Sequence, residues 1–80
     1  MADYVATFHT HLAALRSCRA LTQAGVEARM APVPRVLSSS CGTCVFYRGT
    51  EPMEACMDRD MEAVYRREDG GYQLVCRGTE

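Results

Sequence analysis

Apolar and polar residues follow two different periods along this chain, and each period predicts a type of element. Four stretches are rich in strand-forming residue types or alternate apolar with polar positions, as strands with one buried face do. In the second stretch, for example, Val26, Ala28 and Met30 fall on one face, and Glu27 and Arg29 fall on the other. The predicted strands are residues 3–8, 26–31, 45–47 and 72–77.

Two further stretches show the 3.6-residue period of amphipathic helices. The first predicted helix runs from His11 to Ala24, with Thr10 as its N-cap and Gly25 in the left-handed position after its end. Its buried stripe is predicted to be Ala14, Leu15, Cys18 and Leu21.

The second predicted helix begins near Thr50 or Glu51, carries Pro52 in its first turn and continues to Arg67. Its apolar residues recur at helical spacing, as a stripe of Met53, Cys56, Met57, Met61 and Val64. The turn Asp69-Gly70-Gly71 then leads into the last strand.

The resulting order, β-α-β-β-α-β, predicts an α+β fold in a single domain over residues 1–80. The expected architecture is a ferredoxin-like sandwich, in which a four-stranded antiparallel sheet carries two helices on one face. The other face would bear Val5, Thr7, Phe46 and Val75 without a covering layer. An uncovered face in so small a chain favours a homodimer.

Composition narrows the classes of function. A formal net charge of −1 argues against nucleic acid or an anionic membrane as the main partner. No apolar run approaches the ~20 residues of a membrane-spanning helix, and the start Met1-Ala2-Asp3 does not resemble a signal peptide. The five cysteines are an odd number, which favours reduced thiols and hence a cytoplasmic protein over a secreted disulfide scaffold.

One cysteine differs from the others in its surroundings. Cys18, Cys56 and Cys76 fall on predicted buried stripes, where cysteine packs as a small apolar residue. Cys41 falls in a loop, between the serines at 38–40 and Gly42. The predicted topology brings this loop beside the start of the first helix.

That placement suggests a reactive thiolate at Cys41. A helix N-terminus and a nearby imidazolium both stabilise a thiolate, and His9 and His11 flank the start of the helix. Arg35 would add a further positive charge from the same loop. The alternative is a surface loop with a chance cysteine, in which Ser40 and the histidines have no role.

Cys41 and Cys44 also form a C-x-x-C, which leaves other functions open. With His9 and His11 they supply four zinc ligand types, so a small zinc module is one alternative, although the spacing is not that of a known finger. A thiol–disulfide redox module is another, with Cys44 as the resolving thiol for Cys41. A plain interaction domain without site chemistry is the third. No cofactor other than this zinc is expected.

The run Pro32-Val33-Pro34-Arg35, followed by Ser38-Ser39-Ser40-Cys41-Gly42, resembles the selenium/sulfur carrier protein-like family of small bacterial proteins. The resemblance implies a ferredoxin-like fold and a carrier rather than an enzyme. In that family one motif cysteine is proposed to hold selenium or sulfur as a perselenide or persulfide.

Transferred residue by residue, the resemblance makes Cys41 the carrier thiol, with Arg35, Ser40 and Gly42 as its motif neighbours. It also implies a cysteine desulfurase-type donor and a selenophosphate synthetase-type acceptor. Cys44 departs from the family's commoner pattern, in which an apolar residue stands at this position.

Overall fold

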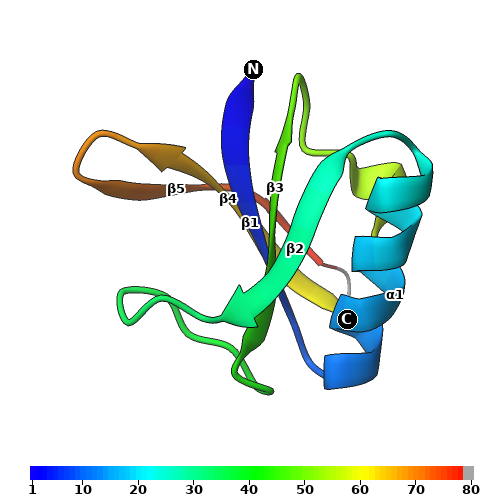
Figure 1. Cartoon of the computed structure of the whole chain (residues 1–80). Helices are drawn as coiled ribbons and strands as arrows, with labels where there is room; N and C mark the ends of the chain where they lie inside the picture. The colour runs from blue at the N-terminus through cyan, green and yellow to red at the C-terminus, as the bar shows by residue number, and fades with distance from the viewer. Residues whose placement is uncertain (79–80) are drawn as a thin grey trace.

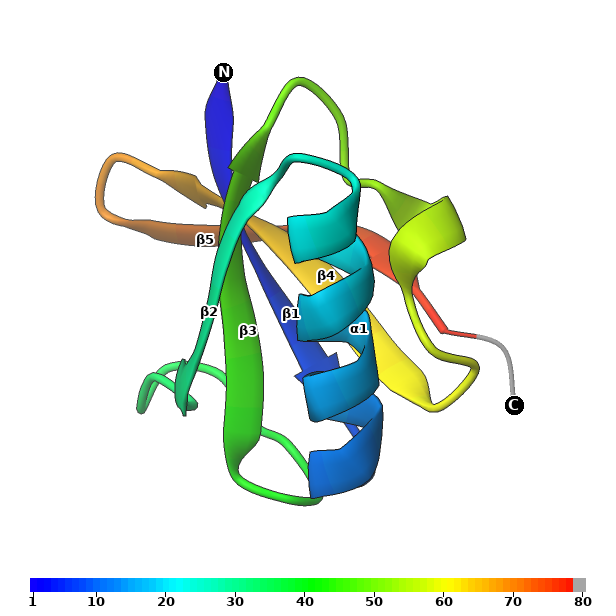
Figure 2. The same cartoon turned by 45° about the vertical axis from the view of Figure 1, so that its right-hand side comes forward.

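A computed structural model describes residues 1–78 of the chain, which form one antiparallel sheet and one α-helix (Figure 1). The elements in chain order are β1 (Ala2–Phe8), α1 (His11–Gln23), β2 (Glu27–Pro32), β3 (Thr43–Gly49), the 3-10 helix η1 (Glu54–Cys56), β4 (Met61–Glu68) and β5 (Gly71–Arg77). The sheet has five strands in the order β2-β3-β1-β4-β5. Figures 1 and 2 show that α1 lies along one face of this twisted sheet.

The first half of the chain folds as its sequence predicts. The side chain of Thr10 caps α1 by accepting a hydrogen bond from the backbone N–H of Ala13 at 3.1 Å. Gly25 follows the helix with φ +84°, a left-handed conformation that glycine adopts without a steric penalty. The predicted strands at 3–8, 26–31 and 45–47 are confirmed, and β3 is two residues longer at each end.

The predicted second helix over residues 50–67 is wrong. Its first half is a loop that contains η1, and the Asp58 carboxylate accepts a hydrogen bond from the N–H of Asp60 at 3.0 Å. Its second half is β4, because the second edge of β1 needs hydrogen-bond partners and this segment provides them.

Asp69 and Gly70 then form a two-residue hairpin loop between β4 and β5, with Gly70 at φ +85°. The fold is therefore α+β with one helix and five strands, and it is not the four-stranded, two-helix ferredoxin-like sandwich.

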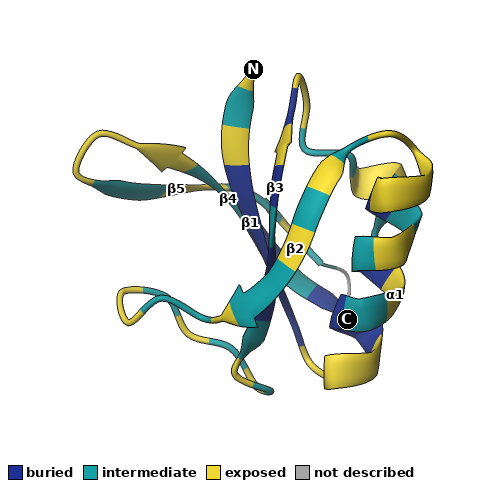
Figure 3. Ribbon diagram, viewed as in Figure 1, coloured by how far each residue is buried: buried dark blue, intermediate teal, exposed yellow. Residues whose placement is uncertain are grey.

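The core lies between α1 and the sheet (Figure 3). Tyr4, Phe8 and Val45 are buried there, and the rings of Tyr4 and Tyr47 stack with centroids 5.3 Å apart. The buried residues of α1 are Ala13, Ala14, Ser17 and Leu21, so the helix is rotated slightly from the predicted stripe, and Leu15 and Cys18 are only half-buried. Ser17 tolerates burial because its hydroxyl accepts a hydrogen bond from the N–H of Asp58 at 2.8 Å.

No helix covers the opposite face of the sheet within residues 1–78. Val5 and Thr7 on this face are nevertheless only 1% exposed. Val5 is paired on one side with Phe46 and on the other with Tyr65, whose larger side chains flank it. In the same part of the chain, no helix is long and apolar enough to span a bilayer.

Candidate functional site

The Cys41 loop, defined as residues 33–42, connects β2 to β3 and folds back toward the end of β1. The N–H of Val33 donates to the carbonyl of Gly42 at 3.1 Å and closes the loop at its base. Gly42 has φ +74°, a conformation that favours glycine strongly over other residues. Ser39 anchors the loop to β1 because its hydroxyl donates to the carbonyl of Phe8 at 2.9 Å.

The sulfur of Cys41 is half-buried and faces acceptors. Its thiol lies 3.4 Å from the carbonyl oxygen of Phe8 and 3.5 Å from that of Thr43, and both geometries fit donation by an S–H group. The Ser39 hydroxyl lies 3.9 Å from the same sulfur. The loop conformation therefore holds the Cys41 thiol against two backbone carbonyls.

Neither histidine is among the hydrogen-bond partners of the Cys41 sulfur within residues 1–78. His9 Nδ1 lies 3.3 Å from the hydroxyl of Ser40, and His11 Nδ1 lies 3.4 Å from the hydroxyl of Thr43. Both imidazoles therefore hold residues that flank Cys41. Of the predicted site residues, Ser40, Gly42 and the two histidines gather around this loop. Arg35 is exposed and takes part in none of the ion pairs found in the described part of the chain.

Glu62 is the strongest tether of the Cys41 loop, and the sequence analysis did not identify it. Its carboxylate accepts the backbone N–H of Ser40 at 3.1 Å and the Ser40 hydroxyl at 2.9 Å. His9 Nδ1 lies 3.5 Å from the same carboxylate. Burial alone would raise the pKa of Glu62. The hydrogen bonds from Ser40 and the nearby His9 outweigh it, so that the pKa lies below its ordinary value.

A register shift between β1 and β4 brings Glu62 to this position. Thr7 pairs with Ala63 and Phe8 pairs with Met61, so Glu62 is the extra residue of a β-bulge. A bulge re-aims a side chain relative to the regular alternation of the strand. The available sequence signal was the Asp69-Gly70 hairpin, which would have identified residues 61–68 as a strand.

Cys44 lies in a different environment from Cys41. Its side chain is 0% exposed, and its sulfur faces the carbonyl oxygen of Pro32 at 3.6 Å. Burial raises the pKa of Cys44 to about 11, with a smaller opposing effect from Arg29. Burial also raises the pKa of Cys76, whereas Cys18 and Cys56 are half-buried free thiols.

The arrangement of the described residues gives no support to the predicted zinc alternative. Within residues 1–78, no group of three or more His, Cys, Asp or Glu side chains is arranged to hold a metal ion. Cys41 and Cys44 face separate backbone carbonyls, and His9 and His11 bind separate hydroxyl groups. The four residues named for zinc therefore do not converge on a common centre.

Comparison with known proteins gives one family and one curated relative. The family model described as "Putative Se/S carrier protein-like" matches residues 3–58, a span that contains β1 except its first residue, together with α1, β2, the Cys41 loop and β3. A relative from Escherichia coli (strain K12), described as "Uncharacterized protein YtiA", is 25% identical over 77 residues, which cover 94% of this chain and 91% of the relative. No solved structure matches the chain.

Proposed function

The chain belongs to the Se/S carrier protein-like family, and from this premise we propose that it carries sulfur or selenium on Cys41 as a persulfide or perselenide. The observation that carries the proposal is the position of Cys41 in the matched span. This cysteine lies in a loop held by exchangeable side-chain hydrogen bonds, at the end of the sheet. Cys44 is fully buried within a strand and is poorly placed to meet another protein.

The transfer step needs no external oxidant or reductant. The Cys41 thiolate attacks the outer sulfur of a persulfide on the donor protein. A new S–S bond forms on Cys41, the S–S bond of the donor breaks, and the donor cysteine leaves as a thiolate with the electron pair. Selenium transfers in the same way from a perselenide, and delivery to the acceptor repeats the exchange.

The contacts of Cys41 suggest how loading would be controlled. The thiol must release the carbonyls of Phe8 and Thr43 and lose its proton before it attacks. Because the loop is also held by the contacts of Ser39 and Ser40, loading requires these hydrogen bonds to open. Gly42 supplies the left-handed backbone next to the sulfur, and His9 positions Ser40.

The partners that fit this chemistry are enzymes that produce and consume the transferred atom. A cysteine desulfurase-type enzyme would be the donor, and a selenophosphate synthetase-type enzyme would be the acceptor. The exchange needs thiols that stay reduced between transfers, which favours the cytoplasm. The chain would then act as a carrier and not as an enzyme.

Mass spectrometry of the intact protein tests the proposal. The reduced chain is incubated with a cysteine desulfurase and either cysteine or selenocysteine, and the expected product gains sulfur or selenium that a reductant removes. Cys41→Ser should abolish the gain, whereas the matched Cys44→Ser should retain it. Loading that persists in Cys41→Ser, or that fails in the unmodified chain with an active donor, would overturn the proposal.

A further inference from the structure

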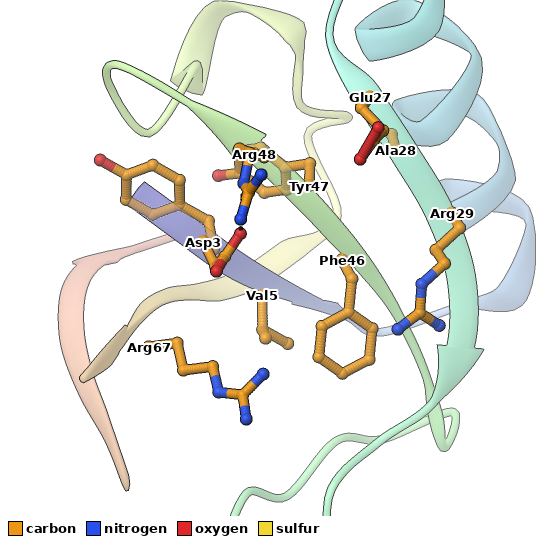
Figure 4. Close-up of a pocket in the computed structure, with 10 residues that line it drawn as sticks. Asp3, Val5, Glu27, Ala28, Arg29, Phe46, Tyr47, Arg48 and Arg67 are labelled. Atoms are coloured by element: carbon orange, nitrogen blue, oxygen red, sulfur yellow. Dashed lines mark hydrogen bonds and ion pairs between the residues drawn. The ribbon is translucent and has the colours of Figure 1, made fainter. Parts of the chain in front are cut away.

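The helix-free face of the sheet contains a pocket with a volume of about 250 Å³, open to solvent (Figure 4). Four strands contribute to it, and its wall combines apolar side chains with arginines. The half-buried Phe46 forms the accessible apolar part, with Val5 buried beneath it, and Asp3, Arg29, Arg48 and Arg67 surround it. Neither the Cys41 loop nor Glu62 contributes to this pocket, so it is a separate site.

The arginines of this pocket differ in whether a carboxylate of the same chain already pairs with them. Arg48 is paired with Asp3 at 3.0 Å. Arg29 and Arg67 take part in none of the ion pairs found within residues 1–78. The Arg29 guanidinium instead lies over the ring of Phe46, with its central carbon 4.8 Å from the ring centroid. Two guanidinium groups beside an apolar surface are therefore available to an anion.

The acidic residues of the wall indicate where that anion would lie. Asp3 and Glu27 are at the end of the pocket nearest Arg48, and both raise the pKa of Arg48. A ligand anion at that end would meet two carboxylates. In Figure 4 the guanidinium groups of Arg29 and Arg67 lie on either side of the Phe46 ring, away from Glu27. The end of the pocket between them is the favourable place for negative charge.

We propose that this pocket binds a segment of a partner protein that presents a carboxylate next to an aromatic side chain. The aromatic group would pack on Phe46, and the carboxylate would bind Arg29 and Arg67. The volume is smaller than the ~300–1,000 Å³ of sites for drug-sized ligands and suits one or two side chains. A nucleic acid fits less well, because the two acidic residues and the net charge of −1 repel an extended polyanion.

The position of the pocket relative to the Cys41 loop bears on the proposed carrier function. Phe46 is on β3, which begins two residues after Cys41, so a partner segment that extended from the pocket along β3 toward Thr43 would approach the Cys41 loop. The identity of the partner as a donor or acceptor of sulfur or selenium rests on the proposed function. The binding of a segment with a carboxylate and an aromatic side chain does not rest on it, so the two proposals are tested separately.

The test is a titration of the full, isotopically labelled chain with a synthetic peptide, followed by NMR. The probe is acetyl-Gly-Glu-Phe-Gly-amide, and its matched control has Gln in place of Glu. We expect shifts at Val5, Arg29 and Phe46 with the first peptide. The Gln peptide should bind roughly tenfold more weakly, as the loss of a charge-assisted hydrogen bond implies.

Three variants complete the design. Arg29→Gln and Arg67→Gln should each weaken binding of the Glu peptide roughly tenfold while the spectrum stays that of the folded chain. Arg59→Gln removes an exposed arginine outside the pocket and should leave binding unchanged. Cys41→Ser, which abolishes loading under the proposed function, should bind the peptide as the unmodified chain does.

Several outcomes would overturn the pocket proposal. They are equal binding of the Glu and Gln peptides, binding that survives both arginine changes, or no shift at these residues up to millimolar peptide. Tighter binding of a thymidine oligonucleotide would assign the face to nucleic acid. Concentration-dependent shifts of the same residues without any peptide would assign it to a second copy of the chain.

Discussion

Cys41 lies in a loop whose polar groups are held by side chains, whereas Cys44 lies three residues later inside β3. The loop contacts are made by Ser39, Ser40, His9 and Glu62, all of which can exchange with water. Cys44 is 0% exposed and is enclosed by strands that pair on both sides of β3. The two thiols of one C-x-x-C therefore differ in access, and burial raises the pKa of the Cys44 thiol.

The difference teaches that C-x-x-C spacing predicts a dithiol pair only when both residues share one local environment. In this chain the boundary between loop and strand falls at Thr43, between the two cysteines. Pleating then directs the Cys44 side chain to the helix-free face, where Thr7 is its register partner. The arrangement favours a carrier that uses one thiol over a redox module that uses two.

The largest expected effect is a difference in alkylation rate between the two cysteines. At pH 8 with iodoacetamide, we expect Cys44 in the folded chain to react about 100-fold more slowly than in the denatured chain. A pKa of about 11, against the ordinary 9.0, leaves roughly one hundredth of the thiolate. Fragment-ion mass spectrometry of residues 36–48, which contain both cysteines, gives each rate.

Cys41 serves as the internal comparison in that experiment. Its sulfur is half-buried and held only by weak S–H contacts, so it should react well before Cys44. Equal rates for the two cysteines in the folded chain would break the comparison. Equal rates in urea are expected, because there both thiols are in water.

The second-largest expected effect concerns the hydrogen bonds that hold the Cys41 loop to Glu62. Glu62→Ala removes the acceptor for both Ser40 hydrogen bonds, and we expect the alkylation rate of Cys41 to rise about tenfold. This corresponds to the ~1.5 kcal/mol of a hydrogen bond to a charged group in a loop that must open. Glu68→Ala, an exposed residue on the same strand, is the matched control.

In Glu62→Ala the rate of Cys44 should stay unchanged, because the change loosens the loop and not the sheet. A uniform rise at every cysteine would instead indicate general unfolding.

The hydrogen bonds between Glu62 and Ser40 should also weaken in acid. Since the folded-state pKa of Glu62 is lowered, its stabilisation is complete above an ordinary pKa of 4.5 and is lost as the pH falls through the folded value. The NMR signal of the Ser40 amide reports that loss.

The sequence was sufficient for the elements that have local signals. β1, α1 and the caps Thr10 and Gly25 follow from residue types within a few positions of one another. The same holds for the Cys41 loop, whose prolines and small polar residues do not continue a strand. The family resemblance drawn from this loop was confirmed by the match over residues 3–58.

The features that the sequence did not predict, β4 and the position of Glu62, depend on pairing between segments that are distant in the chain. Met61 and Val64 fit a helical stripe and a strand equally well, and only the free edge of β1 decides between them. Glu62 reaches Ser40 through a bulge, which no local pattern encodes. The sequence placed the two imidazoles near Cys41, but which groups they contact depends on angstrom-scale loop geometry. The structure directs the two histidines to neighbouring hydroxyls.

A smaller effect is expected from the backbone of the loop. Gly42→Ala should lower the free energy of unfolding by about 1–2 kcal/mol, because φ +74° is strained for a residue with a Cβ. The added methyl group itself would meet nothing within 4 Å. Gly71→Ala is the control, since it also has open space and does not have a positive φ. Chemical denaturation measures both, and equal losses would contradict the role of Gly42.

The smallest effect is the contribution of Cys44 to stability at alkaline pH. Because its pKa is about 11 in the folded chain and near 9.0 when unfolded, the unfolded chain loses its thiol proton first as the pH rises. This contribution to stability is complete below about pH 9 and is lost progressively between about pH 9 and pH 11. At pH 10 the loss is about 1 kcal/mol, since one pKa unit corresponds to about 1.4 kcal/mol.

Comparison with Cys44→Ala isolates this contribution. Tyr47 and Cys76 also have pKa values raised by burial, so the unmodified chain loses stability above pH 9 for several reasons. The variant keeps those groups and lacks only the Cys44 proton. Both proteins are denatured under reducing, oxygen-free conditions at pH 8 and at pH 10. The free energy of unfolding of the unmodified chain should fall more between these two pH values than that of the variant. A difference that stays constant with pH would mean that Cys44 ionises as readily as an exposed thiol, and the contrast with Cys41 would then rest on access alone.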